Sequence, residues 1–209
     1  MEEPIFLDQQ LLDLNQDILQ PPTPAESALS RLSDIALSQY QFKDDRVFQV
    51  PELDLMATAS VFAKMLNCED TMWSFTASRT LDMSPRDAEL LPLSFRPTEA
   101  QRRIMHHPIM DLLPWSSVRT KLICTFAQKA DARPPIARDE MALMRFVNDL
   151  DDSAEGLRVY GEDRSDYNNW EIGQQVFDNW WWAFDVSIVV NSNKLRARRG
   201  APRLMLGAL

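Results

Sequence analysis

The sequence predicts an all-α fold, a compact helical bundle whose helices are joined by proline-punctuated loops. Thirteen prolines stand against five glycines, which suits helices separated by stiff turns because few positions need a positive φ. Apolar residues also recur at helical spacing in several segments. No segment alternates apolar and polar residues over enough positions to predict a strand.

The chain is predicted to have three parts. Residues 1–22 are an acidic amphipathic segment followed by a proline-rich linker, because one helical stripe collects Leu7, Leu11, Leu14 and Ile18. Residues 23–200 form the helical domain, and residues 201–209 form a C-terminal tail.

Capping signals predict where the first helices begin. Thr23-Pro24-Ala25-Glu26 is a capping box that opens a helix to about Tyr40, and Pro51 starts the next helix. Ser84-Pro85 caps a short helix that Pro92 ends. Thr98 to Gln101 caps another, which ends before Pro108 because residues that precede proline avoid the helical region.

Periodicity predicts the later helices. The first spans Trp115 to Gln128 with Val118, Leu122 and Phe126 inward, and the second spans Ile136 to Leu150 with the stripe Met141, Met144 and Val147. Residues 157–160 are expected to be a short extended piece, and residues 170–199 one long helix or two. Three consecutive tryptophans, Trp180 to Trp182, cannot share one helix face, so at least one should reach the surface or a partner.

Composition narrows the class of protein. Cys68 and Cys124 are too few for a disulfide framework, and no apolar run approaches the roughly 20 residues of a membrane span. The N-terminus, Met1-Glu2-Glu3-Pro4, is acidic, whereas targeting peptides start basic. We therefore expect a nuclear or cytoplasmic protein that is not secreted and has no membrane partner.

The net charge of −9 argues against a broad nucleic-acid-binding face. The exception is a basic stretch near the C-terminus, which contains Lys194, Arg196, Arg198, Arg199 and Arg203.

The densest motif is a helix, a proline-bounded turn and a second helix, spanning residues 95–119. Asp111 can accept hydrogen bonds from amides of the turn. Arg119 follows Trp115 by one helical turn, so its guanidinium can stack on the indole or pair with Asp111. We expect these residues to be mainly architectural, with Asp111 and Arg119 in one pair or network.

This motif resembles a domain of unknown function found C-terminal to basic leucine zippers in fungal transcription regulators. The residues that fit its pattern are Pro97, Thr98, Gln101, His106, His107, Pro108, Asp111, Leu113, Pro114, Trp115 and Arg119. Further matches are Val159 to Asp163, Trp170-Glu171, the aromatic run with Phe177, Trp180 and Trp182, Asn191 to Arg196, and Arg199-Gly200. The resemblance covers about residues 92–200.

The resemblance implies association with transcription regulators and carries no established activity. We expect its motif residues to serve structure or partner contact: His106, His107, Pro108, Asp111, Pro114, Trp115, Arg119, Trp170, Trp180, Arg196 and Arg199. A basic region and a zipper are missing, because prolines interrupt the region that should hold them. We therefore expect protein partners and no sequence-specific DNA binding by this chain alone.

The alternative is a small helical enzyme of unknown reaction in fungal secondary metabolism. The string His106 to Asp111 is similar to the histidine motif of condensing acyltransferases, which would make His107 and Asp111 acid/base candidates. The acidic run Asn148 to Glu155 is similar to the carboxylates of terpene cyclases, but a solvated helix end explains it better. With two adjacent histidines and no phosphate loop, we expect no catalytic residue, metal or cofactor.

Overall fold

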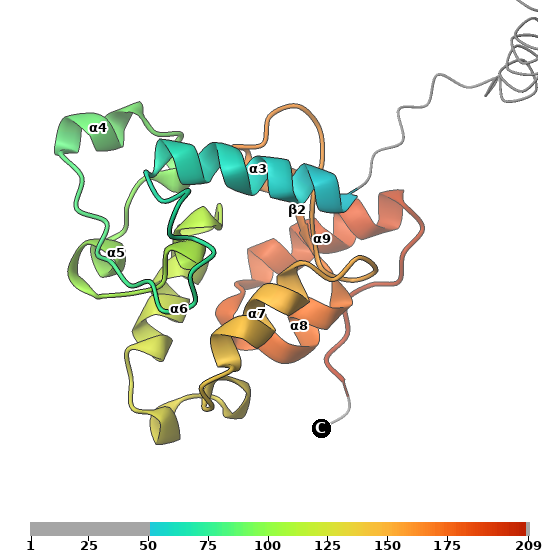
Figure 1. Ribbon diagram of the computed structural model, residues 1–209. Helices are drawn as coiled ribbons and strands as arrows, with labels where there is room; N and C mark the ends of the chain where they lie inside the picture. Colours follow the sequence, from blue (N-terminus) through green and yellow to red (C-terminus); the bar gives the residue numbers. More distant parts are fainter. Residues whose placement is uncertain (1–50, 208–209) are drawn as a thin grey trace, which may run out of the picture. The chain divides into compact units, whose positions relative to one another are not determined.

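The computed structural model describes residues 51–207, in which helices are the main elements (Figure 1). The helices expected in residues 1–22 and from Thr23 to about Tyr40 lie outside the described residues, as does the boundary at residue 22. Within residues 51–207, no helix is both long and apolar enough to cross a membrane.

The first half contains α3 (Pro51–Met65), α4 (Pro85–Leu90), α5 (Glu99–Arg103) and α6 (Ser116–Phe126). Their predicted starts are confirmed. The Ser84 hydroxyl accepts the backbone N–H of Asp87 at 3.1 Å. The Thr98 capping box is complete, because Gln101 N donates to the Thr98 hydroxyl and Thr98 N donates back to the Gln101 side chain.

The all-α prediction is wrong, because the second half contains a β-hairpin. The order is α7 (Ala142–Leu150), β1 (Leu157–Val159), β2 (Trp170–Ile172), α8 (Gln174–Trp180) and α9 (Val186–Arg198). The strands pair antiparallel with Leu157 opposite Ile172 and Val159 opposite Trp170. Each strand has only three residues, Leu-Arg-Val in β1 and Trp-Glu-Ile in β2, and so short an alternation of apolar and polar residues is not recognisable as a strand in the sequence. The extended piece expected at residues 157–160 contains β1.

Two predicted helices are shorter than expected. The helix expected from Ile136 begins only at Ala142, because a separate 3₁₀ turn occupies Pro135–Ala137. Its buried face carries Phe146 and Leu150, whereas Met141 of the predicted stripe is 56% exposed. Residues 170–199 contain two helices, one of the two expected alternatives, and the first begins at Gln174 rather than at Trp170 and ends at Trp180.

The three consecutive tryptophans differ in solvent exposure, as expected. Trp180 is fully buried, Trp182 is half-buried and Trp181 is 49% exposed. The break between α8 and α9 lets the chain turn here, and only one of the three rings belongs to the centre of the core.

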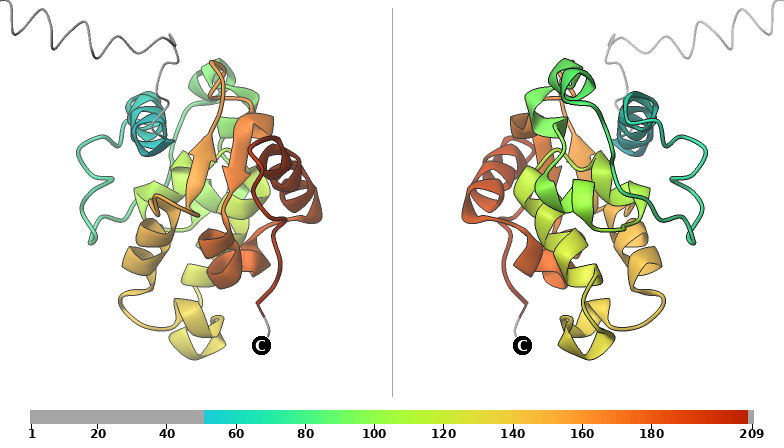
Figure 2. Two further views of the ribbon diagram at one scale, coloured as in Figure 1. Left: turned by 90° about the vertical axis from the view of Figure 1, so that its right-hand side faces the viewer. Right: turned by 90° about the vertical axis from the view of Figure 1, so that its left-hand side faces the viewer.

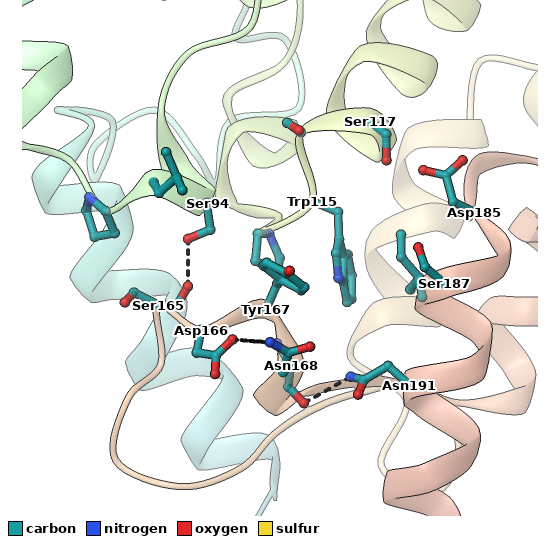
Figure 3. Close-up of a pocket in the computed structure, with 15 residues that line it drawn as sticks. Ser94, Trp115, Ser117, Ser165, Asp166, Tyr167, Asn168, Asp185, Ser187 and Asn191 are labelled. Atoms are coloured by element: carbon teal, nitrogen blue, oxygen red, sulfur yellow. Dashed lines mark hydrogen bonds between the residues drawn. The ribbon is translucent and has the colours of Figure 1, made fainter.

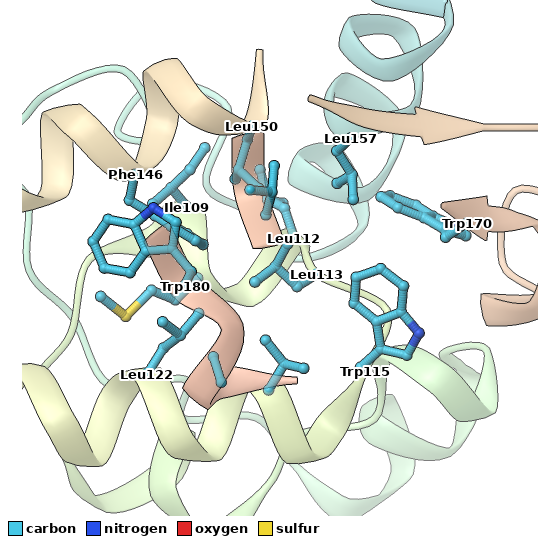
Figure 4. Packing of buried hydrophobic residues seen from close by; sticks show 14 of the residues in the cluster. Ile109, Leu112, Leu113, Trp115, Leu122, Phe146, Leu150, Leu157, Trp170 and Trp180 are labelled. Atoms are coloured by element: carbon cyan, nitrogen blue, oxygen red, sulfur yellow. The ribbon is translucent and has the colours of Figure 1, made fainter. Parts of the chain in front are cut away.

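The core combines aliphatic side chains with a group of aromatic rings and draws on both halves of the described chain (Figure 4). The Trp115 ring meets the edges of Trp170 and Phe184 at centroid distances of 6.1 and 6.0 Å, and Phe146 meets Trp180 at 4.8 Å. The hairpin runs between two helices, since α3 packs on β1 and α9 packs on β2 (Figure 2). Pro114 and Trp115 therefore join the motif of the first half to the hairpin of the second.

The join between β2 and α8 predicts a stability effect. A Cβ at Gly173 would collide with the backbone carbonyls of Glu155 and Gly156. Gly173→Ala should therefore lower the free energy of unfolding by about 1–3 kcal/mol, as overpacking does elsewhere. Gly207→Ala is the matched control, because the nearest atom to its Cβ is 3.8 Å away. Denaturant unfolding of both variants tests this, and equal midpoints would contradict it.

Candidate functional site

Asp111 is the centre of the first network of motif residues. It lies in the 3₁₀ turn Pro108–Leu112 and is fully buried. Its Oδ2 accepts from Arg79 Nε at 2.9 Å and Nη2 at 2.7 Å, and its Oδ1 accepts from Gln101 Nε2 and His106 Nε2, both at 2.7 Å. Burial alone would raise the pKa of Asp111, but His106, Gln101 and Arg79 hold it below the usual value.

Arg119 reaches Asp111 through Gln101 and is itself fully buried. Its Nε donates to Gln101 Oε1 at 3.0 Å, while its other nitrogens donate to the carbonyls of Ser94, Arg96 and Leu113 at 2.6–2.8 Å. Burial lowers the pKa of Arg119 to about 10. The expected shared network is confirmed. Direct pairing with Asp111 or stacking on Trp115 is not found among the described residues.

The two histidines make different contacts. His106 Nδ1 faces the Ile104 carbonyl at 2.6 Å and its Nε2 faces Asp111 Oδ1 at 2.7 Å. His107 Nδ1 accepts from Ile109 N at 3.2 Å and its Nε2 donates to the Ser74 carbonyl at 2.9 Å, so that ring is neutral. Burial lowers the pKa of His107.

The same network fixes the loop of residues 66–78. Arg79 Nη1 donates to the carbonyls of Leu66 and Asn67 at 2.9 and 3.2 Å, and Arg79 pairs its backbone with His106 in an isolated antiparallel bridge. His107 holds the loop at Ser74. Between these anchors the loop presents Trp73 and Phe75, which are 52% and 51% exposed.

A second network unites the C-terminal motif residues. Glu171 is fully buried on β2 and accepts from Arg199 Nη2 at 2.8 Å and from the Tyr160 hydroxyl at 2.8 Å. Arg196, 1% exposed, pairs with Glu155 at 2.5 Å and lies 3.5 Å from Glu171. These contacts hold α9 against the hairpin, so Arg196 and Arg199 have a structural role, one of the two roles expected of the motif residues.

The remaining predicted site residues are structural as well. Pro108 and Pro114 bound the 3₁₀ turn, Trp170 donates its indole N–H to the Arg164 carbonyl at 2.8 Å, and Trp180 donates to Asp149 at 2.8 Å. Asp149 is only 6% exposed, so the expected solvated helix end is wrong at this position. Gln175 and Asn179 of α8 complete its shell.

The sequence interpretation missed several partners of these residues. Arg79, Glu155 and Asp149 complete the buried networks, but each lies 26 or more residues from at least one partner in the chain. No local spacing joins them. An unpaired buried charge is costly, so Asp111 and Arg196 need partners once they are buried. The sequence motif does not identify which residues those partners are.

A polar pocket of about 600 Å³ opens between the starts of α6 and α9 and the turn Tyr167–Asn169 (Figure 3). Its walls are tied by hydrogen bonds from Ser94 to the Ser165 carbonyl at 2.6 Å and from Asn191 to the Asn168 carbonyl at 2.9 Å. Asp185 pairs with Lys121 at 2.6 Å, and hydrogen bonds from Lys121 and Ser117 lower the pKa of Asp185. The described lining offers serine and tyrosine hydroxyls, asparagine amides and two carboxylates, so the pocket suits a ligand that forms hydrogen bonds.

An apolar groove of about 140 Å³ lies beside α3, and we call it the α3 groove. Asp151 is the one charged residue in its described lining: Leu55, Met56, Ala59, Met72, Trp73, Ile109, Leu112, Leu113, Val147, Leu150, Asp151, Leu157 and Trp170. Trp73 belongs to the loop that Arg79 and His107 hold. The motif residues therefore position one wall of this groove.

Metal and thiol chemistry gain no support within residues 51–207. No group of three or more His, Cys, Asp or Glu residues there has the geometry to hold a metal ion. The Cys68 and Cys124 thiols are free, and burial raises the pKa of Cys68 to about 11, which keeps it protonated.

The buried Asp111 network predicts a large stability effect. Asp111→Ala strands the Arg79 guanidinium and leaves the Gln101 amide and the His106 ring without their partner, so it should lower the free energy of unfolding by about 3–5 kcal/mol. Lys121→Ala breaks a pair whose side chains are 40% and 41% exposed, and should cost less than about 1 kcal/mol. Urea titration of both variants tests the contrast, which similar losses would contradict.

His107 predicts a pH dependence. Its folded pKa lies below its ordinary 6.5, so the unfolded chain takes up the proton first as the pH falls. The stability that His107 contributes is fully present above pH 6.5 and is lost on acidification below it. His107→Gln should therefore show a shallower decline in stability below pH 6.5 than the parent, measured by denaturation across the pH range. Parallel curves would contradict the neutral, buried assignment.

Comparison with curated proteins and with solved structures finds no significant match. A family match covers residues 74–189, more than half of the chain, and includes Arg79, both histidines, Asp111, Arg119, the hairpin and α8. The chain therefore belongs to the family described as Domain of unknown function (DUF3425).

Proposed function

We propose that this chain is a non-enzymatic regulatory protein that acts through protein contacts in transcription regulation. Its resemblance to the domain that follows basic leucine zippers in fungal transcription factors points to that process, and to the nucleus as its place of action. The observation that carries the proposal is the loop of residues 66–78. It is held at Ser74 and at both Leu66 and Asn67, yet it exposes about half of Trp73 and Phe75.

Large aromatic side chains on a fixed backbone are typical anchors of protein interfaces, because they contribute apolar area at a low cost in conformational entropy. Trp73 also lines the α3 groove, as does Met56 of α3, which is 37% exposed. The family motif thus supports a surface that suits protein contact.

The acid/base candidates of the alternative enzyme, His107 and Asp111, are poorly arranged for catalysis, and so is the neighbouring His106. His106 and Asp111 are at most 5% exposed, and both are engaged within the network. His107 has both ring nitrogens committed to backbone groups. A general acid or base must reach the proton that it transfers, and none of these groups faces either pocket. This favours a protein-contact role over the alternative of a small metabolic enzyme.

The basic stretch offers less to DNA than its sequence suggested. Arg196 and Arg199 are engaged by Glu155 and Glu171, which leaves Lys194, Arg198 and Arg203 as exposed cations of that stretch. Three phosphate contacts correspond to a log–log salt slope of only about −3. We therefore propose that the chain alone does not read a DNA sequence.

A tethering experiment tests this function. The full chain, fused to an unrelated DNA-binding domain, should change transcription from a reporter that carries the cognate site. The double variant Trp73→Ser/Phe75→Ser should lose most of this effect, because it removes the exposed rings without touching the backbone anchors. Reporter output and thermal melting of the purified chain are the measurements.

Two controls sharpen the experiment. Tyr167→Ser removes a ring that is 51% exposed in the polar pocket, and it should leave the reporter effect intact. The untethered chain should leave the reporter unchanged. A tethered chain that leaves reporter output unchanged would overturn the proposal. An equal loss of the reporter effect in the Trp73→Ser/Phe75→Ser and Tyr167→Ser variants would show that the surface at Trp73 is not its basis.

A further inference from the structure

The α3 groove has an apolar floor and an adaptable rim. Met72, at 3% exposure, forms part of the floor, while Met56 and Trp73 stand at the rim. Small-molecule sites occupy about 300–1,000 Å³, so a groove of 140 Å³ is too small for most of them. It can hold one or two anchoring side chains of a polypeptide. Methionine is common on surfaces that bind helical segments, because its flexible thioether adapts to different partners.

One end of the groove is acidic. Asp151 caps the C-terminus of α7, where its backbone N–H donates to the Val147 carbonyl and its side chain is exposed. The carbonyl end of a helix adds partial negative charge there. Asp152 follows, and Arg158 directs its guanidinium to the carbonyls of Ser153 and Ala154. Glu69 and Asp70, which precede Met72 and Trp73 on the same loop, are exposed as well.

We propose that the α3 groove binds an amphipathic helix of a partner protein that carries a Lys or Arg beside its apolar stripe. The apolar stripe would sit against Met56, Met72 and Trp73, and the cation beside Asp151. This inference rests on the proposed protein-contact function and adds the chemistry of the partner. Strand addition is a poor alternative, because β1 offers only three residues as a template.

Synthetic helices test the partner chemistry on the full chain. The probe is a peptide of about 18 residues, or roughly five helical turns, with leucine at i, i+3, i+4 and i+7 and lysine beside that stripe. Its counterparts carry glutamate in place of lysine, or the lysine composition in scrambled order. Calorimetry should find the lysine helix bound at least about fivefold more tightly than either counterpart, the factor that corresponds to roughly 1 kcal/mol.

Charge reversal separates the groove from the general acidity of the protein. Asp151→Lys should lose the preference for the lysine helix and bind the glutamate helix at least as well. Asp166→Lys makes the same change of net charge in the polar pocket and should keep the preference. Trp73→Ser should weaken both helices. Melting curves confirm that each variant remains folded.

Several results would overturn the inference. Equal affinity for the lysine and glutamate helices, or an equal shift in Asp151→Lys and Asp166→Lys, would show that the groove does not select a basic helix. Self-association of the parent chain that Trp73→Ser abolishes, seen by sedimentation, would assign the groove to a second copy instead. If none of the synthetic helices binds but the tethered reporter still depends on Trp73 and Phe75, only the proposed chemistry of the partner is wrong.

Discussion

The carboxylate of Asp111 connects three segments that are distant in the sequence. It receives Arg79 from the end of the loop of residues 66–78, Gln101 from α5 and His106 from the strand-like segment before the 3₁₀ turn. Gln101 extends the network to Arg119, which holds three carbonyls of the segments around it. Removing a buried charge of this kind leaves several others unpaired, so the arrangement is cooperative rather than a sum of separate pairs.

The second half repeats this solution, because a buried carboxylate again lies at the centre with arginine side chains around it. Glu171 is buried on β2 and is satisfied by Arg199 and Tyr160, while Arg196 joins it to Glu155. Such contacts let a two-stranded hairpin persist, since an isolated hairpin is only marginally stable. The halves meet through Trp115, whose ring touches Trp170 and Phe184. The polar pocket opens along that same join.

Local signals in the sequence predicted much of this fold. Thr98 and Ser84 predicted the starts of their helices, because a cap involves residues only three positions apart. Pro51 likewise predicted the start of α3. The hairpin was not predicted because a strand of three residues, such as Trp170–Ile172, is too short for its alternation of apolar and polar residues to indicate a strand. The motif indicated Asp111 and Arg119, but the Arg79 partner depends on a contact across 32 positions. The α3 groove likewise depends on tertiary packing that no local pattern encodes.

The anchored loop has a kinetic consequence for whatever meets Trp73. A segment that must order itself on binding loses conformational entropy at that moment, and this loss weakens the complex. Here Arg79 and His107 have already fixed the backbone on both sides of Trp73 during folding. Association with such a preorganised surface needs little rearrangement. Substitutions of Trp73 should therefore change the lifetime of a complex more than its rate of formation.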